Sequence, residues 1–66
     1  MYNDINIEKL RRDLIDYFGS AINCGYPQLI IEISNIENMN SEELINYAIN
    51  NGFDINDYIE NKKLYL

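Results

Sequence analysis

The fold is decided by the stretch from Asn40 to Tyr58, which reads N-S-E-E-L-I-N-Y-A-I-N-N-G-F-D-I-N-D-Y. Asn40 and Glu43 have the spacing of a capping box, in which each side chain accepts a hydrogen bond from the other residue's backbone N–H group. Apolar residues then follow at the spacing of a helix with one buried face: Leu44, Ile45, Ala48 and Ile49. Gly52 is expected to end this helix, and Phe53 to pack back onto it.

The end of this helix, Ala48 to Phe53, has an earlier counterpart at Ala21 to Tyr26. Both runs read Ala-Ile-Asn, then one variable residue, then Gly and an aromatic residue. We interpret them as two helices that use the same glycine stop independently. A duplicated helix–turn–helix unit is the alternative, although the match fades outside these runs.

An earlier helix is predicted from about Ile7 to Cys24, with Asn6 or Asp4 as its N-cap. Its apolar face is a regular stripe: Ile7, Leu10, Leu14, Phe18, Ala21 and Ile22, widened by Ile15 and Tyr17. Opposite charges fall four residues apart in two pairs: Glu8 with Arg12, and Lys9 with Asp13. Gly19 is the weak point of this helix. If it is helical, it costs about 1 kcal/mol relative to alanine. The alternatives are a close approach of another backbone and an early stop.

The segment from Gln28 to Asn38 has two interpretations. Leu29, Ile33 and Ile36 repeat at helical spacing, and Ile30 extends that face. The run from Leu29 to Ile33 also suits a β-strand by propensity. We favour the helix, because a single strand would have no partner in a chain that is otherwise helical.

A short helix is expected after Gly52, capped by Asp54 or Asn56 and carrying Ile55, Tyr58 and Ile59. The elements together predict an all-α protein. It is a small bundle of three main helices plus a short C-terminal helix, and residues 1–66 form a single helical domain.

The charge pattern argues against nucleic-acid binding. The formal net charge is −6, and the five basic residues all lie near the ends: Lys9, Arg11, Arg12, Lys62 and Lys63. From Asp13 to Glu60 the chain carries nine acidic residues and no basic one. A nucleic-acid site needs a clustered basic face. The acidic stretch is interpreted as a solvated surface, with an acidic patch facing a basic partner as the alternative.

The residue types needed for chemistry are scarce. The sequence has no His and a single Cys, which excludes a disulfide within the chain and disfavours a structural zinc site. No serine has a histidine to activate it. Cys24 is expected near a helix C-terminus, where the dipole disfavours a thiolate, and is interpreted as a small buried apolar residue. We therefore expect no catalytic residue, no metal, no cofactor and no enzymatic activity.

No segment is long and apolar enough to span a membrane, and the start of the chain, Met1 to Asp4, does not resemble a signal peptide. A lone unpaired thiol suits a reducing compartment. The expected localisation is therefore cytoplasmic.

The apolar content points to an interaction. Hydrophobic residues make up 47% of the chain, with six Tyr and two Phe. A domain of this size buries only about 60% of its unfolded surface. We therefore expect a homo-oligomer or a protein partner to cover apolar surface. The candidate interaction residues are Ile30, Ile31, Leu64, Tyr65 and Leu66. The expected function is that of a protein-protein interaction or regulatory module.

Two segments, Leu10 to Ala21 and Ser41 to Asp54, resemble short uncharacterised acidic helical proteins of Firmicutes, especially clostridia, which have no assigned activity. The run from Ile7 to Leu14 is similar to the opening of small helical-hairpin phosphatases that act on sporulation response regulators. That likeness implies an alternative function, a phosphatase-like regulator of a response-regulator receiver domain. The Ser-Gln-x-Leu-Asp core of those phosphatases does not occur here, and Ser34 to Glu37 is the nearest run.

Overall fold

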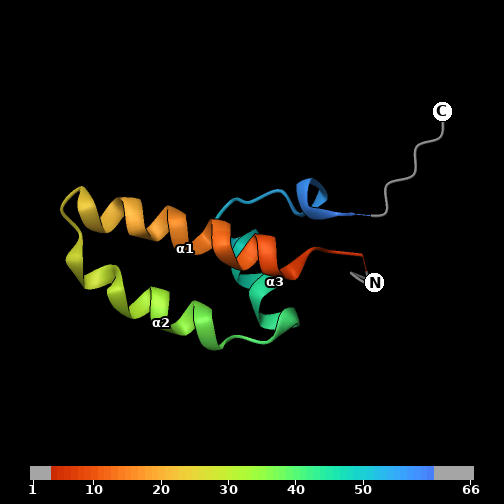
Figure 1. The fold of residues 1–66 in the computed structure, drawn as a ribbon, viewed down its shortest axis with the longest axis horizontal. Helices are drawn as coiled ribbons and strands as arrows, with labels where there is room; N and C mark the ends of the chain where they lie inside the picture. Colours follow the sequence, from red (N-terminus) through yellow and green to blue (C-terminus); the bar gives the residue numbers. More distant parts are fainter. Residues whose placement is uncertain (1–3, 61–66) are drawn as a thin grey trace.

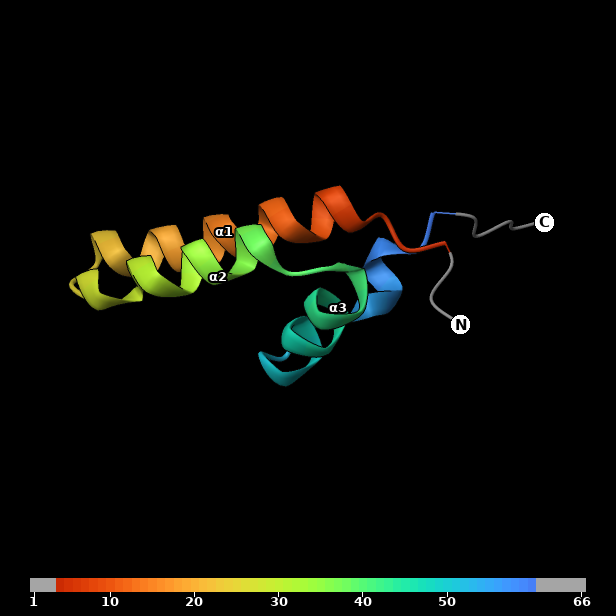
Figure 2. The same cartoon turned by 90° about the horizontal axis from the view of Figure 1, so that it is seen from below.

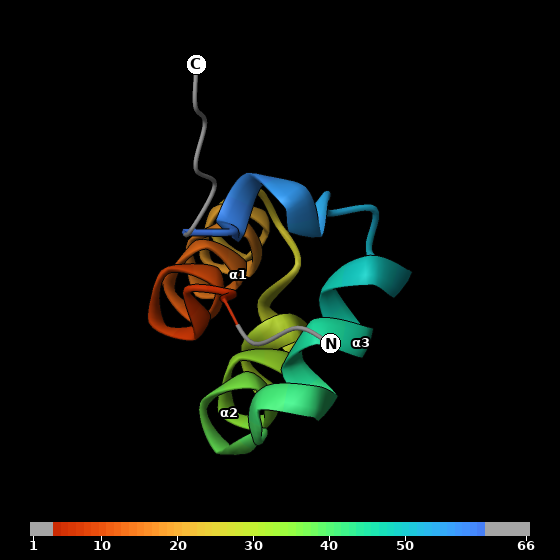
Figure 3. The same ribbon diagram turned by 90° about the vertical axis from the view of Figure 1, so that its right-hand side faces the viewer.

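The computed structural model describes residues 4–60, and it confirms the all-α prediction. The elements in chain order are α1 (Ile7–Asn23), η1 (Pro27–Leu29), α2 (Ile30–Asn38), α3 (Ser41–Asn50) and η2 (Ile55–Tyr58), where η marks a 3₁₀ turn. Helices α1 and α2 form an antiparallel hairpin, and α3 crosses one half of it (Figure 1). Seen from the end, α1, α2, α3 and η2 surround one core (Figure 3). The C-terminal helix of the prediction is the 3₁₀ turn η2.

Helix α1 begins where its sequence signals place it. Asn6 is the N-cap, and its Oδ1 accepts a hydrogen bond from the backbone N–H of Lys9 at 3.0 Å. The buried residues lie one turn apart along the predicted stripe: Leu10, Leu14 and Phe18. Of the two predicted charge pairs, Lys9 and Asp13 make an ion pair at 3.2 Å. The Glu8–Arg12 pair does not form within residues 4–60, because both side chains extend into solvent.

Gly19 lies inside α1 and neither ends the helix nor touches another backbone. A Cβ atom placed on Gly19 would have no neighbour within 4 Å. Gly19 is therefore a residue within the helix, as first interpreted, and neither of the two alternatives occurs. The helix continues through Gly19 to Asn23, and the residue before it, Phe18, is buried in the core.

Gly19→Ala is expected to raise the free energy of unfolding by about 1 kcal/mol, because alanine loses less backbone freedom than glycine in a helix. Urea denaturation followed by circular dichroism measures the change. Gly25→Ala is the matched control, and it should destabilise the protein because Gly25 has a φ of 115°. Stabilisation by both substitutions would contradict the assigned backbone conformations.

The two glycine stops have the same hydrogen-bond geometry. At the end of α1, Gly25 donates to the carbonyl of Ile22 at 3.2 Å and Tyr26 donates to that of Ala21 at 3.1 Å. This pair of bonds is a Schellman motif. The end of α3 has the same motif. Gly52 donates to the carbonyl of Ile49 at 3.0 Å, and Phe53 donates to that of Ala48 at 2.9 Å. Different elements follow the two stops, α2 in one case and η2 in the other, so local capping accounts for the sequence echo.

The segment after the first stop is helical, as favoured above. Pro27 occupies the first position of η1, and α2 continues directly from it. Ile36 is completely buried, while Leu29 and Ile33 are partly buried against the core. Ile30 was expected to extend this face, but its side chain is 57% exposed. It lies one residue past the 3₁₀ turn, whose tighter winding rotates it away from the Leu29 side.

A side chain from α1 binds the carbonyl groups at the C-terminal end of α2. The Arg11 Nη1 atom donates to the carbonyl oxygens of Ile36 at 2.7 Å and Met39 at 3.0 Å, and contacts that of Glu37 at 3.4 Å. The last turn of α2 contains no basic residue of its own. The neighbouring Arg12 is exposed, whereas the Arg11 guanidinium binds the negative end of the α2 dipole.

Helix α3 begins at the predicted capping box. The Asn40 Oδ1 accepts from the Glu43 backbone N–H at 2.9 Å, and the Glu43 Oε1 accepts from that of Asn40 at 3.0 Å. Leu44, Ile45 and Ala48 are buried as expected. Ile49 was placed on the same face, but it is 45% exposed. Ile49 lies one turn after Ile45 on the same side of α3. In the last turn of the helix, that side no longer faces the core.

The two ends of the described chain are joined. Ile5 and Ile59 form an isolated antiparallel bridge, and the Glu60 backbone N–H donates to the carbonyl of Asp4 at 2.8 Å. The Tyr58 hydroxyl donates to the Asp13 carboxylate at 2.7 Å, and the Lys9 ammonium lies 4.9 Å from the centre of the Tyr58 ring. The end of η2 is thereby fixed against the first half of α1.

Within residues 4–60, no helix has both the length and the apolarity that crossing a membrane requires.

Candidate functional site

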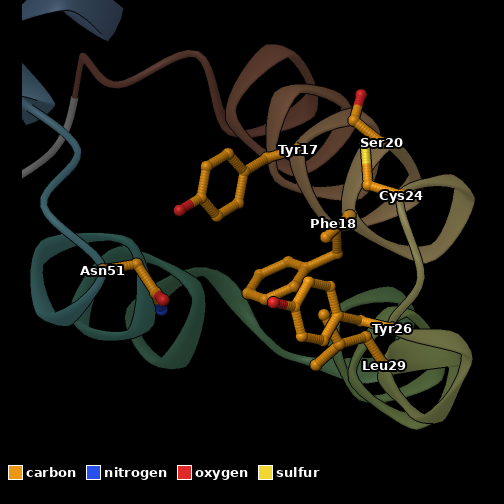
Figure 4. Close-up of a pocket in the computed structure, with 8 residues that line it drawn as sticks. Tyr17, Phe18, Ser20, Cys24, Tyr26, Leu29 and Asn51 are labelled. Atoms are coloured by element: carbon orange, nitrogen blue, oxygen red, sulfur yellow. The ribbon is translucent and has the colours of Figure 1, made fainter.

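An apolar groove opens between the second half of α1, the η1 turn and the end of α3 (Figure 4). It has a volume of about 470 Å³. Its lining residues, called the aromatic groove from here on, are Tyr17, Phe18, Ser20, Ala21, Cys24, Tyr26, Leu29 and Asn51. None of these eight side chains carries a formal charge, so the groove offers mainly apolar area with hydroxyl, thiol and amide groups at its edge.

The groove exists because the helices differ in length. Helix α1 has 17 residues, whereas α2 has 9 and α3 has 10. The hairpin of α1 and α2 therefore projects beyond α3, as both side views show (Figures 1 and 2). Over the projecting half, the apolar stripe of α1 is covered by η1 and α2 but lacks a third helix. The side of α1 that no third helix covers lines the groove.

The floor of the groove is held by a chain of aromatic contacts. The Phe18 side chain is 8% exposed, and its ring lies 5.1 Å from that of Tyr17 in an edge-on arrangement. Tyr17 in turn meets Phe53 edge-on at 5.6 Å, and Phe18 lies 6.0 Å from Tyr47. Such pairs add about 0.5–1.5 kcal/mol beyond the burial of area. The floor is therefore ordered before any ligand arrives.

Tyr47 also ties α3 to α2. Its hydroxyl donates a hydrogen bond to the Glu32 Oε1 atom at 2.6 Å. Burial, followed by this bond to a carboxylate, raises the pKa of Tyr47 to about 12. Tyr58 is in a similar position: burial, followed by its bond to Asp13, raises its pKa to about 12. The Tyr58 hydroxyl in turn lowers the pKa of Asp13.

The raised pKa values of Tyr47 and Tyr58 predict that the protein loses stability at alkaline pH. A free tyrosine ionises near pH 10, so the unfolded chain releases these protons before the folded protein does. Their stabilising effect is complete below pH 10 and falls as the pH rises from 10 to about 12. The urea midpoint measured at pH 9 and pH 11.5 should show the fall, and Tyr47→Phe combined with Tyr58→Phe should reduce it. An unchanged fall in that variant would contradict the assignment.

The sequence-predicted interaction residues divide into two groups. Ile30 and Ile31 are 57% and 63% exposed, and they follow Leu29 of the groove directly along the chain. The structure therefore places them in the first turn of α2, at the projecting end of the hairpin. Leu64, Tyr65 and Leu66 lie outside the described residues.

Two exposed groove residues were not singled out from the sequence. Tyr17 and Tyr26 are 53% and 55% exposed. Tyr17 was expected to widen the core stripe, and Tyr26 was matched with Phe53 as the aromatic residue after a glycine stop. The backbone of Tyr26 does fold back, but its ring faces the groove. A signal was available for Tyr17, because one residue before Phe18 it is turned about 100° from the centre of the stripe.

The predicted burial of Cys24 is wrong. It was interpreted as buried, but the structure shows an exposed thiol at the rim of the aromatic groove. The reason is its position as C-cap of α1, where the chain turns away from the core toward Gly25.

The charges around the groove have one sign. Asp16 precedes Tyr17 and Asp54 follows Phe53, and both carboxylates are exposed. The basic residues in the described part of the chain all lie in the first half of α1: Lys9, Arg11 and Arg12. Lys9 is paired with Asp13, and Arg11 binds the end of α2. The charged residues next in sequence to the Tyr17–Phe53 ring contact are therefore both acidic, and the described chain has no basic residue after Arg12.

The run nearest to the core motif of the phosphatases, Ser34 to Glu37, lies on α2. Ser34 and Glu37 are exposed, whereas Ile36 between them is completely buried. Residues 4–60 contain no group of three or more His, Cys, Asp or Glu side chains arranged to hold a metal ion.

Neither the known protein families, nor the curated proteins, nor the solved structures give a significant match to this chain.

Proposed function

We propose that this chain is a non-enzymatic protein-interaction module. Its docking site is the aromatic groove together with Ile30 and Ile31 at the same end of the hairpin. The observation that carries the proposal is the concentration of exposed large apolar side chains there, four of the five in the described chain: Tyr17, Tyr26, Ile30 and Ile31. Clustered apolar surface on a small domain is typical of a protein-protein contact.

The chemistry of the groove supports binding of an apolar segment. Tyrosine side chains combine a large apolar ring with a hydroxyl group and have few rotatable bonds, so they are ordered at low entropic cost. Leu29 and Ala21 complete an apolar lining, while Ser20 and Asn51 supply polar atoms at the edge. A groove of this kind accepts two or three apolar side chains from a partner and hydrogen-bonds to its backbone. The exposed thiol of Cys24 suits a reducing compartment, and we place the protein in the cytoplasm.

Site-specific photo-crosslinking tests the proposal. A benzophenone amino acid in place of Ile31 is expected to trap a protein when cells expressing the chain are irradiated, because that side chain is 63% exposed at the end of the hairpin that carries the groove. The same group in place of Asn46, an exposed residue of α3, is the matched control and should trap little.

The trapped product should depend on the groove. Tyr26→Asp places a charge in the apolar lining without touching the core, since Tyr26 is 55% exposed. In this variant the crosslink from position 31 should fall at least about tenfold, which corresponds to the loss of one interface hot spot. Equal yields at positions 31 and 46, or a yield unaffected by Tyr26→Asp, would refute the proposed docking site.

A further inference from the structure

We infer that the aromatic groove receives the segment from Lys62 to Leu66 of a second copy of this chain. The inference rests on the proposed function, since it takes the groove as the docking site and names its occupant. Three observations carry it: the chemistry of the groove, the composition of the segment, and the distance between the groove and the end of the described chain.

The groove selects for an apolar segment with positive charge. Its lining is uncharged and rich in aromatic rings, and the nearby charges belong to acids such as Asp16 and Asp54. From residue 13 to residue 60 the chain has no basic side chain. A ligand that fills the groove therefore gains from apolar anchors, and positive charges beside them are attracted by the surrounding carboxylates.

The segment after Glu60 has this composition. It reads Asn61-Lys62-Lys63-Leu64-Tyr65-Leu66, with two lysines directly before three large apolar residues. Every other basic residue of the chain lies in the first half of α1, where Lys9 and Arg11 are already bound within the fold. The volume of about 470 Å³ lies in the range of pockets that enclose a small ligand or a few side chains.

The segment of the same molecule reaches only the near end of the groove. Glu60 lies beside the start of α1, where its carboxylate accepts a hydrogen bond from the Asn6 side chain at 2.8 Å. Tyr17 is the first lining residue on α1, eleven residues after Asn6 or about 16 Å along the helix, and Cys24 is about 27 Å along it. Residues 61–66 span at most about 20 Å when fully extended, and Leu64 reaches only about 13 Å. The last residues of the segment can therefore reach Tyr17, but Leu64 cannot, and no residue of the segment reaches the far end of the groove at Cys24.

A second copy removes this limit. Each molecule donates its Lys62–Leu66 segment and receives the same segment from its partner, which gives a closed two-fold dimer. Direct contact between two grooves would instead bring two acidic surfaces together, which is unfavourable. The exchange buries the apolar residues of both segments, and it pairs the lysines of one copy with the carboxylates of the other.

Isotope-mixed crosslinking of the full chain tests the inference. A benzophenone amino acid replaces Tyr65, and equal amounts of ¹⁴N- and ¹⁵N-labelled protein are mixed before irradiation. The expected product has the mass of a dimer, and its crosslinks join position 65 of one isotope to peptides covering residues 17–29 of the other. Crosslinks confined to one isotope would overturn the inference, as would mixed crosslinks that map outside residues 17–29.

Light scattering on full-length variants gives a second readout. Leu64→Asp combined with Leu66→Asp, and separately Tyr26→Asp, should each raise the dimer dissociation constant at least about tenfold. Asn61→Asp, next to the segment but outside its apolar part, is the control and should have a much smaller effect. A wild-type chain that stays monomeric at high micromolar concentration would overturn the inference.

The two proposals fail in different ways. A groove-dependent crosslink from position 31 to a different protein, with a monomeric chain, would refute the second copy as occupant and leave the docking site standing. The loss of groove dependence at position 31 would refute the docking site itself, and the inferred occupant with it.

Discussion

Ile36→Ala is expected to lower the free energy of unfolding by about 2–5 kcal/mol, the usual cost of emptying a fully buried aliphatic site. The Ile36 side chain has no exposed area and packs at the centre of the bundle, from the helix that the sequence left ambiguous. A chain of 66 residues has a total stability of only about 3–10 kcal/mol. The substitution should therefore remove most of it, and urea denaturation followed by circular dichroism measures the loss.

The same helix provides a matched control. Ile31→Ala removes the same atoms from a side chain that is 63% exposed, so its effect should stay within about 0.5 kcal/mol. The comparison separates the loss of packing from any change in helix propensity, because both residues are isoleucines on α2. Similar losses for Ile31→Ala and Ile36→Ala would show that α2 does not present the observed face to the core.

Arg11→Ala is expected to lower the free energy of unfolding by about 2 kcal/mol. Hydrogen bonds to a charged group contribute about 1.5–3 kcal/mol to stability. The Arg11 guanidinium donates such bonds to the part-buried carbonyls of Ile36 and Met39. Without it, the end of α2 loses both its hydrogen-bond donor and the cation at its negative pole. Thermal unfolding and urea denaturation both measure the effect.

The neighbouring arginine is the control. Arg12 is exposed, and Arg12→Ala should change the stability by less than about 0.5 kcal/mol. Arg11→Lys should fall between the two, because an ammonium keeps the charge but lacks the fork of donors that reaches several carbonyls. If Arg11→Ala and Arg12→Ala had equal effects, the link between α1 and the end of α2 would be refuted.

The difference in helix length connects the fold to the proposed function. Helices α2 and α3 are short, so the longer α1 has more apolar surface than they cover. The uncovered part lies at the projecting end of the hairpin, while the described ends of the chain meet at the other end of α1. The same arrangement that exposes the groove therefore separates it from Glu60, the last described residue.

Half of the candidate site was accessible from the sequence. Ile30 and Ile31 were chosen from the sequence because the chain has more apolar residues than a small domain buries, and because they lie in the ambiguous segment from Gln28 to Asn38. Tyr17 and Tyr26 did not stand out, since a tyrosine next to a core stripe or after a glycine stop is found as often inside a small domain as outside it. Their exposure depends on the missing third helix at the end of the hairpin.

The sequence by itself determined where the helices begin and end. Asn6 and Asn40 cap their helices, and Gly25 and Gly52 stop theirs, because capping involves hydrogen bonds among residues only a few positions apart. For the segment from Gln28 to Asn38, the helix followed from agreement with the rest of the chain rather than from its own propensity.

Only the tertiary structure decided which apolar residues are covered. Ile45 is buried and Ile49, one turn later in the same row, is exposed. Ile36 is buried, whereas Ile30 and Ile31 are exposed on the same helix. Arg11 and Arg12 are adjacent, yet only Arg11 meets the end of α2. These outcomes depend on where α3 crosses the hairpin and how far α1 extends past it. Those are distances between segments remote in sequence, which no local pattern contains.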